Sequence, residues 1–309
     1  NICRFFVTKP KYEVFEGKLT TRGHMQRTGS LLSAPGMLTL LVFLLLPIAG
    51  LVVLAFMQRG AYGVIDWTPS LENAKRLLGF SSFGWASDNL LIIGRSLLLA
   101  SVTTLLCLAL AFPMAFWISA HKPSTRALLL AFIMVPSCTN LVIRTYAWML
   151  VLGAQMPPTW IARAIGIIGE TETLYPGQFA VYVGMVSSML PFSILPLYTC
   201  VERLDWRIVE ATKDLYASPL RVFRHGILSQ MTIGIVSSVI LTFVPSLGMY
   251  VVSDLLGGSK YMLIGNLIQQ QFGAASDWPF GAMLGIVLIL ASVLSLALLQ
   301  KISKGKSYV

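Results

Sequence analysis

Four side chains in the apolar part of this sequence have the chemistry that binds an organic cation: Tyr146, Trp148, Tyr250 and Asp254. Aromatic faces attract ammonium groups through cation–π contacts, and a carboxylate pairs with them directly. Tyr250 precedes Asp254 by one helical turn, so both lie on one helix face. Asp254 is about 22 residues, roughly 33 Å, from the start of its apolar segment, which places it at the far membrane surface. We therefore expect these residues to line the outer entrance of a membrane path.

Arg144, near the outer end of another apolar segment, allows a different interpretation. Arg144 and Asp254 either pair with each other or extend separately to the membrane interface. If Arg144 neutralises Asp254, the acid that selects a cation must come from elsewhere, such as a second chain. The aromatic residues, together with Tyr198, also suit an interfacial belt. The sequence leaves these alternatives open.

A polar segment from Glu202 to Met231 holds four acidic and five basic residues, although only 12% of the chain is charged. An apolar residue recurs at helical spacing through its first half, at Leu204, Ile208, Ala211 and Leu215. Ser218 followed by Pro219 is a helix-start signal. The pattern predicts helix, a turn at Tyr216–Ala217, and helix. Such a structured segment indicates a partner on the water side, and a helix lying on the bilayer surface is the alternative.

The sequence lacks the motifs of three enzyme classes. No Gly-x-x-x-x-Gly-Lys-Ser/Thr loop is present, since Gln300 stands where Gly305-Lys306-Ser307 would need its first glycine. The three histidines fall outside the apolar segments, which gives no metal cluster in the membrane. A Gly-x-Ser-x-Gly nucleophile motif is also missing. We therefore expect neither an ATPase nor an intramembrane enzyme, and neither a metal nor a cofactor on this chain.

The elements that position these residues are membrane spans. Of the 309 residues, 56% are hydrophobic, and a span needs about 20 apolar residues. Hydrocarbon offers the backbone no hydrogen-bond partner, so we expect an all-α integral membrane protein. Six transmembrane helices are predicted, at residues 36–57, 92–118, 127–152, 179–201, 232–254 and 281–300.

The basic residues predict the orientation. Sixteen of the 23 Lys and Arg residues fall on the side that carries both termini and the 202–231 segment. Cytoplasmic segments carry such an excess, so we expect a cytoplasmic arm at 1–34 and a cytoplasmic tail at 301–309. The net charge of +10 follows from this topology. It favours anionic lipid headgroups as neighbours and requires no nucleic acid.

Prolines interrupt five of the six predicted spans. Broken helices open polar paths in transporters, but proline is also common in membrane helices generally. The pair Pro191 and Pro196 favours the first explanation, because two breaks within six residues predict a weak point.

Several motifs together resemble a known family. The run Glu210-Ala211-Thr212-x-Asp214-Leu215-Tyr216-Ala217-Ser218, followed by Gly226-Ile227-Leu228-Ser229, resembles the EAA loop of ABC importer permeases. Five further stretches, within residues 36–300, resemble the polyamine permeases of this class. They are His121–Arg126, Ile143–Trp148, Ser253–Gly258, Leu263–Asn266 and Asp277–Gly281. The chain is similar to the first permease of spermidine/putrescine importers.

This resemblance implies a type I importer permease fold in a bacterial inner membrane, with a cytoplasmic coupling helix. It also implies a second, non-identical permease, two ATPase subunits that hold ATP and Mg, and an external substrate-binding protein. The residues that would couple to the ATPase are Glu210, Ala211, Thr212, Asp214, Leu215, Tyr216, Ala217 and Ser218. Thr212, Tyr216 and Ser229 depart from the usual alanine, glycine and proline of the motif.

Three alternative functions remain. A stand-alone secondary carrier of organic cations would also be a multi-span protein, although such carriers often show inverted repeats and ionisable groups near the midplane. This sequence shows neither. A membrane scaffold without transport would leave the prolines and the 202–231 segment without a role. A related permease for a different substrate is the third possibility.

Overall fold

The computed structural model describes residues 20–60, 63–81, 84–85, 88–169, 171–215, 218–258 and 261–305. Residues 1–50 form one unit and residues 51–309 another. The first contains most of helix α1 (Thr20–Ala55), whose apolar side chains are exposed from Met37 to Leu46. The predicted 1–34 arm is therefore helical from Thr20, and residues 1–19 lie outside the described part.

Among the described residues, four helices are long and apolar enough to cross a membrane: Pro35–Ala55 of α1, α3 (Asp88–Ser119), α7 (Gln178–Glu202) and Trp278–Leu298 of α13 (Trp278–Gly305). Two bent helix pairs raise the number to six if each pair is one span. The all-α membrane class is therefore confirmed. The last helix continues to Gly305, into the predicted 301–309 tail, whose final four residues are not described.

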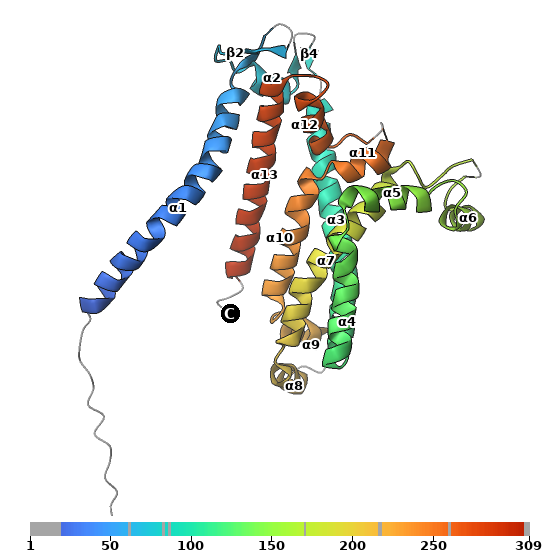
Figure 1. Ribbon diagram of the computed structural model, residues 1–309. Helices are drawn as coiled ribbons and strands as arrows, with labels where there is room; N and C mark the ends of the chain where they lie inside the picture. Colours follow the sequence, from blue (N-terminus) through green and yellow to red (C-terminus); the bar gives the residue numbers. More distant parts are fainter. Residues whose placement is uncertain are drawn as a thin grey trace, which may run out of the picture. The chain divides into compact units, whose positions relative to one another are not determined.

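Helices α3, α7 and α10 (Thr232–Gly248) pack against one another through small side chains (Figure 1). Ser193 of α7 and Ser238 of α10 are fully buried, and their hydroxyl oxygens are 2.5 Å apart. A Cβ on Gly234 would lie 3.0 Å from the carbonyl oxygen of Pro196, so glycine permits this approach. Helix α7 runs without a break through Pro191 and Pro196, which does not support the predicted weak point.

The third predicted span, 127–152, is not one helix. Helix α4 (Pro123–Met134) passes into a 3₁₀ turn, η2 (Val135–Cys138), and a new helix, α5 (Leu141–Val151), follows at 95°. Pro136 cannot donate an i→i−4 hydrogen bond. The side chain of Asn140 accepts a 2.8 Å hydrogen bond from the Val142 N–H and so caps the new helix. Local sequence therefore causes the bend.

The fifth predicted span, 232–254, is also interrupted. Helix α10 ends at Gly248, Met249 is extended, and a separate short helix, α11 (Val251–Gly257), carries Asp254. A Cβ on Gly265 would lie 2.9 Å from the Gly248 carbonyl oxygen, because the start of α12 (Ile264–Phe272) packs against the break. The predicted depth of Asp254 assumed one continuous helix, and the structure does not have that helix.

The two ends of the 51–309 unit differ in structure (Figure 1). One end has two short hairpins, β1 (Gln58–Arg59) with β2 (Ile65–Asp66) and β3 (Phe80–Ser81) with β4 (Gly84–Trp85), and α2 (Glu72–Leu77). The Arg76 guanidinium joins α2 to buried Asp277 before α13, at 2.9 Å. The other end has α8 (Trp206–Leu215), α9 (Pro219–Val222) and the π-helix η3 (Phe223–Ile227). On the side between these ends is α6 (Pro157–Ala164).

Candidate functional site

The helical loop, defined as residues 202–231, folds as two helical pieces, as the sequence predicted. Its second piece begins at Pro219 with Ser218 as the N-cap residue, as predicted, although the serine side chain makes no cap hydrogen bond. The turn residues Tyr216 and Ala217 lie outside the described residues. Gly226 of η3 packs on α8: a Cβ there would be 3.2 Å from the Thr212 hydroxyl and 3.4 Å from the Val209 Cα. Thr212, which departs from the family motif, is therefore part of the contact between the two pieces.

The apolar stripe of α8 lies on its exposed side. Val209 and Thr212 are buried, whereas Ile208, Ala211 and Leu215 are exposed, Leu215 by 80%. Leu204 is buried and precedes the first helical residue, Trp206. The part of the stripe that lies in α8 is therefore an exposed apolar face, which fits both sequence interpretations, a partner on the water side and a bilayer surface.

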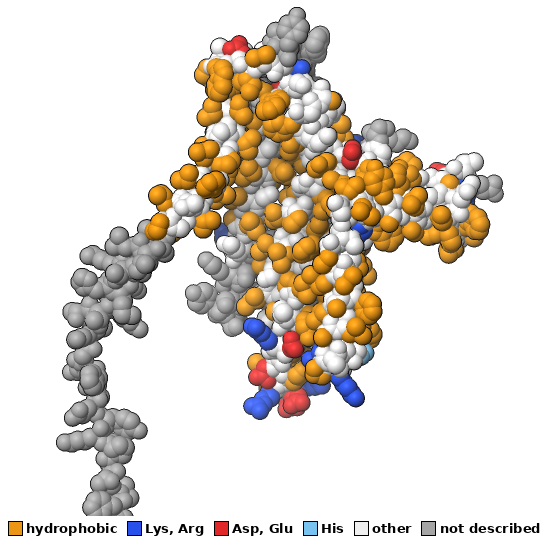
Figure 2. Space-filling model, viewed as in Figure 1, with side chains coloured by type: hydrophobic (Ala, Val, Ile, Leu, Met, Phe, Trp, Pro, Cys, Tyr) orange, Lys and Arg blue, Asp and Glu red, His pale blue; other side chains and the backbone are white. Residues whose placement is uncertain are grey.

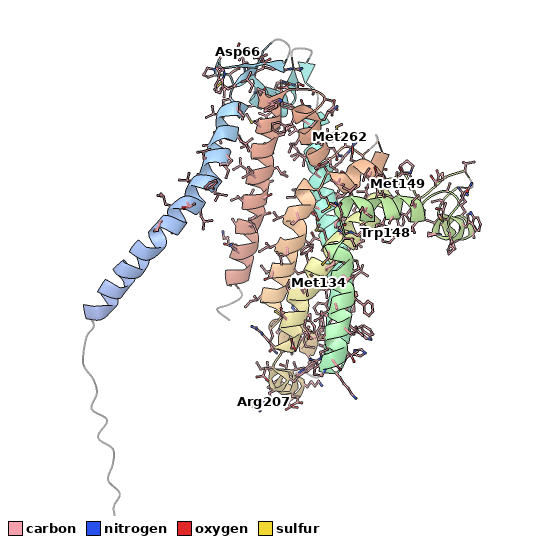
Figure 3. The ribbon with its side chains drawn as sticks, in the orientation of Figure 1. Asp66, Met134, Trp148, Met149, Arg207 and Met262 are labelled. Atoms are coloured by element: carbon pink, nitrogen blue, oxygen red, sulfur yellow. The ribbon has the colours of Figure 1, made fainter. Side chains whose placement is uncertain are left out.

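The exposed side of the helical loop combines apolar and charged groups. Glu210 and Asp214 lie one turn apart on α8 and are exposed, as are Leu215 and Ser218. A groove of about 510 Å³ runs between α8 and the second helical piece, with Trp206, Lys213 and Phe223 among its lining residues. In Figure 2, blue and red side chains gather at this end of the unit, below a largely orange surface. Arg207 marks the same end in Figure 3.

Hydrogen bonds fasten the two sides of the helical loop to each other. The Gln230 side-chain oxygen accepts from the Asp205 N–H at 3.0 Å, and its amide donates to the Gly226 carbonyl oxygen at 2.6 Å. At the base of the loop, Arg126 of α4 pairs with Glu202 at 3.6 Å. The Ser229 hydroxyl donates to the carbonyl of His225, where the family motif has proline. These contacts therefore hold the two helical pieces in a fixed arrangement beneath the exposed surface of the loop.

Tyr146 and Trp148 lie on α5 and Asp254 lies on α11, two helices that pack together, and Tyr250 is the N-cap residue of α11. The Asp254 N–H donates to the Tyr250 carbonyl oxygen at 2.8 Å, so the two remain one turn apart, as predicted. Both side chains are exposed, as is Tyr146. Trp148 is partly buried against the cluster that contains Leu152 and Val252; Figure 3 labels it on α5. The structure thus brings the two segments that carry the predicted entrance residues together.

Arg144 does not pair with Asp254. Its guanidinium donates to the Pro136 carbonyl oxygen at 3.0 Å and so supports the bend between α4 and α5. The Asp254 carboxylate instead accepts a hydrogen bond from the side-chain amide nitrogen of Asn266, at 3.5 Å. Among the described residues, no cation lies within 4 Å of Asp254.

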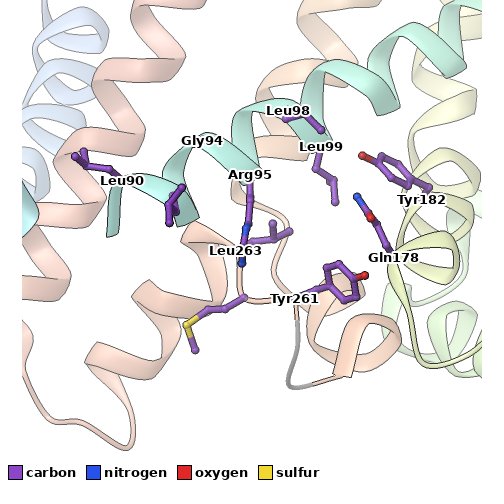
Figure 4. A pocket seen from close by; sticks show the side chains of 11 residues that line it. Leu90, Gly94, Arg95, Leu98, Leu99, Gln178, Tyr182, Tyr261 and Leu263 are labelled. Carbon is purple, nitrogen blue, oxygen red and sulfur yellow. The ribbon is translucent and has the colours of Figure 1, made fainter. Parts of the chain in front are cut away.

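A cavity of about 660 Å³ lies beside α12, between α3 and α7 (Figure 4). Arg95, Gln178, Tyr182 and Tyr261 supply its polar groups, and leucines form much of the wall. Its one charged lining residue is a cation, which disfavours a second cation. None of the predicted entrance residues lines it. Within the described ranges, no three His, Cys, Asp or Glu residues gather in a way that suits a metal ion.

Sequence reasoning missed the roles of Gly226 and Asn266. Both lie in stretches that carried the family resemblance, so the motif itself was the available signal. Their roles depend on contacts with α8 and α11, which spacing along one helix does not reveal.

The comparisons with known proteins agree with this architecture. The model of the family described as binding-protein-dependent transport system inner membrane component matches residues 107–307. The spermidine/putrescine transport system permease protein PotB of Haemophilus influenzae is 32% identical, over 86% of this chain and 90% of that protein. PotB of Escherichia coli K12 is 33% identical, over 86% and 94%.

Solved structures support the fold alone, because their sequence identity is low. A bacterial ABC transporter involved in the import of the acidic polysaccharide alginate has a chain with a TM-score of 0.63 and 15% identity, covering 92% of this chain and 98% of that one. A second alginate transporter structure, with a bound periplasmic protein, gives a TM-score of 0.61 at 14% identity. The relatives of this chain are transport permeases and not enzymes. The chain itself belongs to the binding-protein-dependent transport system permease family and is a multi-pass inner-membrane protein.

Proposed function

We propose that this chain is a permease subunit of an ATP-driven importer and forms half of the translocation path for polyamines such as spermidine and putrescine. The observation that carries this proposal is the similarity to two PotB permeases over 86% of the chain. The exposed Asp254 carboxylate and the Tyr250 ring fit such a substrate, because both attract ammonium groups. The tyrosine and tryptophan of α5, Tyr146 and Trp148, complete the proposed entrance.

The proposed partners are a second, non-identical permease, two ATPase subunits that bind ATP and Mg, and an external substrate-binding protein. The helical loop supports an ATPase contact, because Ile208 and Leu215 are exposed beside Glu210 and Asp214. Leu220, on the second helical piece, is 75% exposed. Protein interfaces combine an apolar centre with a charged rim in this way. Glu210, Ala211, Thr212, Asp214, Leu215 and Ser218 are the proposed coupling residues among those described.

The proposed orientation places the helical loop and both termini in the cytoplasm. The support is the excess of Lys and Arg on that side of the predicted spans. Asp254 and Tyr250 then face the outside, where a binding protein delivers substrate.

Purification in mild detergent from the native membrane tests the proposal. An ATPase and a second, different permease should co-purify, and spermidine uptake by the reconstituted complex should require ATP and the binding protein. Isolation of the chain alone, with uptake driven by an ion gradient, would favour a secondary carrier. ATP-driven uptake of a different solute would retain the permease and change its substrate.

A further inference from the structure

Asn266, in the first turn of α12, makes four polar contacts from a nearly buried position, 9% exposed. Its side-chain oxygen accepts from the Ser253 hydroxyl at 2.6 Å and from the Leu263 N–H at 3.3 Å. Its amide nitrogen is 3.3 Å from the Tyr250 carbonyl oxygen and 3.5 Å from a carboxylate oxygen of Asp254. One side chain therefore contacts two of the four proposed entrance residues, Tyr250 and Asp254.

The orientation of this amide follows from its neighbours. A backbone N–H is only a donor, so the atom that faces Leu263 must be the oxygen of Asn266. A flipped amide would set two donors against each other at Leu263 and two acceptors against each other at Tyr250. The NH₂ group is therefore directed at the Tyr250 carbonyl and the Asp254 carboxylate.

The start of α12 is itself held in place. The Ile264 N–H donates to the Ser96 hydroxyl of α3 at 2.8 Å. Ser96 is buried, and its hydroxyl donates to the Ile92 carbonyl oxygen at 2.9 Å. On the other side, Gly265 closely approaches the carbonyl of Gly248. Asn266 is thus presented to α11 from a rigid support, as positioning groups require.

The charge of the partner matters for a cation entrance. A guanidinium beside Asp254 would offset its charge, whereas an amide donates a hydrogen bond and leaves the charge in place. The nearby cation, Arg144, is occupied by the Pro136 carbonyl oxygen. The Asp254 carboxylate is therefore oriented by a neutral group and remains available to an ammonium group.

We infer that Asn266 is a positioning residue for polycation entry, which holds Tyr250 and Asp254 on α11 in their outward arrangement without neutralising the carboxylate. This inference rests on the proposed function. Asn266 acts through Asp254, and it needs no contact with the substrate.

A double-mutant cycle tests the inference in cells that carry the complete importer. The measurement is the spermidine concentration dependence of uptake for wild type, Asn266→Ala, Asp254→Asn and the double variant, normalised to assembled importer. Each single variant should raise the KM for spermidine by about 3- to 10-fold with little change in maximal rate, and the double variant should resemble Asp254→Asn alone, because coupled neighbours are not additive.

Two control variants separate positioning from folding. Asn73→Ala removes another buried asparagine, whose amide donates to the carbonyl oxygens of Ala55 and Met57. Asn73→Ala should lower the amount of assembled importer, and the reduction should be the same in the wild-type and the Asp254→Asn background. If Asn266→Ala does not accumulate, Asn266→Ser replaces it, since a hydroxyl near the Leu263 N–H retains a polar partner but does not reach Asp254.

The outcomes are distinct. An unchanged KM in Asn266→Ala, or an equal rise in the Asp254→Asn background, would overturn the positioning role and leave the importer proposal intact. An unchanged KM in Asp254→Asn would remove Asp254 from the entrance, and the role of Asn266 with it. Absence of ATP-dependent spermidine uptake in the wild type would instead refute the proposed function.

Discussion

The helical loop and the α11 region are both polar, but they are built in opposite ways. In the helical loop, packing residues such as Val209, Thr212 and Gly226 come from one stretch of 30 residues, and charged and apolar side chains remain exposed. Around α11, polar contacts join three helices, α3, α11 and α12, through Ser96, Ser253 and Asn266, and all three side chains are buried. The Ser96 contact spans 168 residues of the sequence.

This difference suggests different functions: the helical loop has the exposed side chains of a docking surface, and the α11 region has the internal hydrogen bonds of a binding site. An exposed apolar and charged surface is completed by another protein, so its function is lost when a partner is repelled. A buried hydrogen-bond network is completed within the chain, so its function changes when a donor or acceptor is removed. The following experiments test whether the two regions respond separately.

Reversal of charge on the helical loop should have the largest effect. Glu210→Lys should release the ATPase and abolish uptake, because a mismatched charge at an interface costs about 2 kcal/mol or more. The measurement is the amount of ATPase that co-purifies with the chain. Glu72→Lys makes the same charge change at an exposed position on α2 and should leave co-purification unchanged. Full retention of the ATPase in Glu210→Lys would exclude this residue from the contact.

A smaller effect is expected where the two pieces of the helical loop meet. Gly226→Ala places a Cβ 3.2 Å from the Thr212 hydroxyl, and overpacking of this kind costs about 1 kcal/mol. ATPase retention should fall several-fold while the KM for spermidine is unchanged. Thr212→Ala, which restores the residue usual in the motif, should rescue the variant by making room.

Gly94→Ala is the matched control for this pair, because a Cβ on Gly94 meets no atom within 4 Å. A drop in ATPase retention that Thr212→Ala fails to correct would show that the Gly226 contact does not organise the docking surface.

The membrane class and the start of the second loop helix at Ser218 followed from sequence, because hydropathy and the Ser-Pro signal are local properties. The residues that α8 buries, Val209 and Thr212, did not, since their burial depends on packing against Gly226 of the second helical piece. The breaks at Pro136 and Gly248 divide two spans that the sequence predicts as single helices. In the predicted span 232–254, residues 232–248 lie on α10 and Asp254 lies on a separate helix, α11.

The hydrogen-bond partner of Asp254 could not be predicted from the sequence either. Charge alone offered Arg144 as a partner and left open whether the two residues pair or extend separately to the interface. The structure instead turns Arg144 toward the Pro136 carbonyl, and a neutral amide from α12 reaches the carboxylate. Such a contact depends on two helix breaks and on the close approach of Gly265, so periodicity along one segment does not predict it.

The smallest effect on transport should follow removal of the Arg144 charge. Arg144→Gln should leave the KM for spermidine within about twofold, since a charge that is not paired with Asp254 contributes little to its potential in a high-dielectric entrance. If Arg144 neutralised Asp254, its removal would free the carboxylate and lower the KM about tenfold. Arg163→Gln provides the control, because Arg163 also donates to a backbone carbonyl, that of Glu172, at 2.8 Å. A lower KM in Arg144→Gln but not in Arg163→Gln would show that Arg144 offsets the charge of Asp254. That result would contradict the conclusion that the partner of Asp254 is neutral.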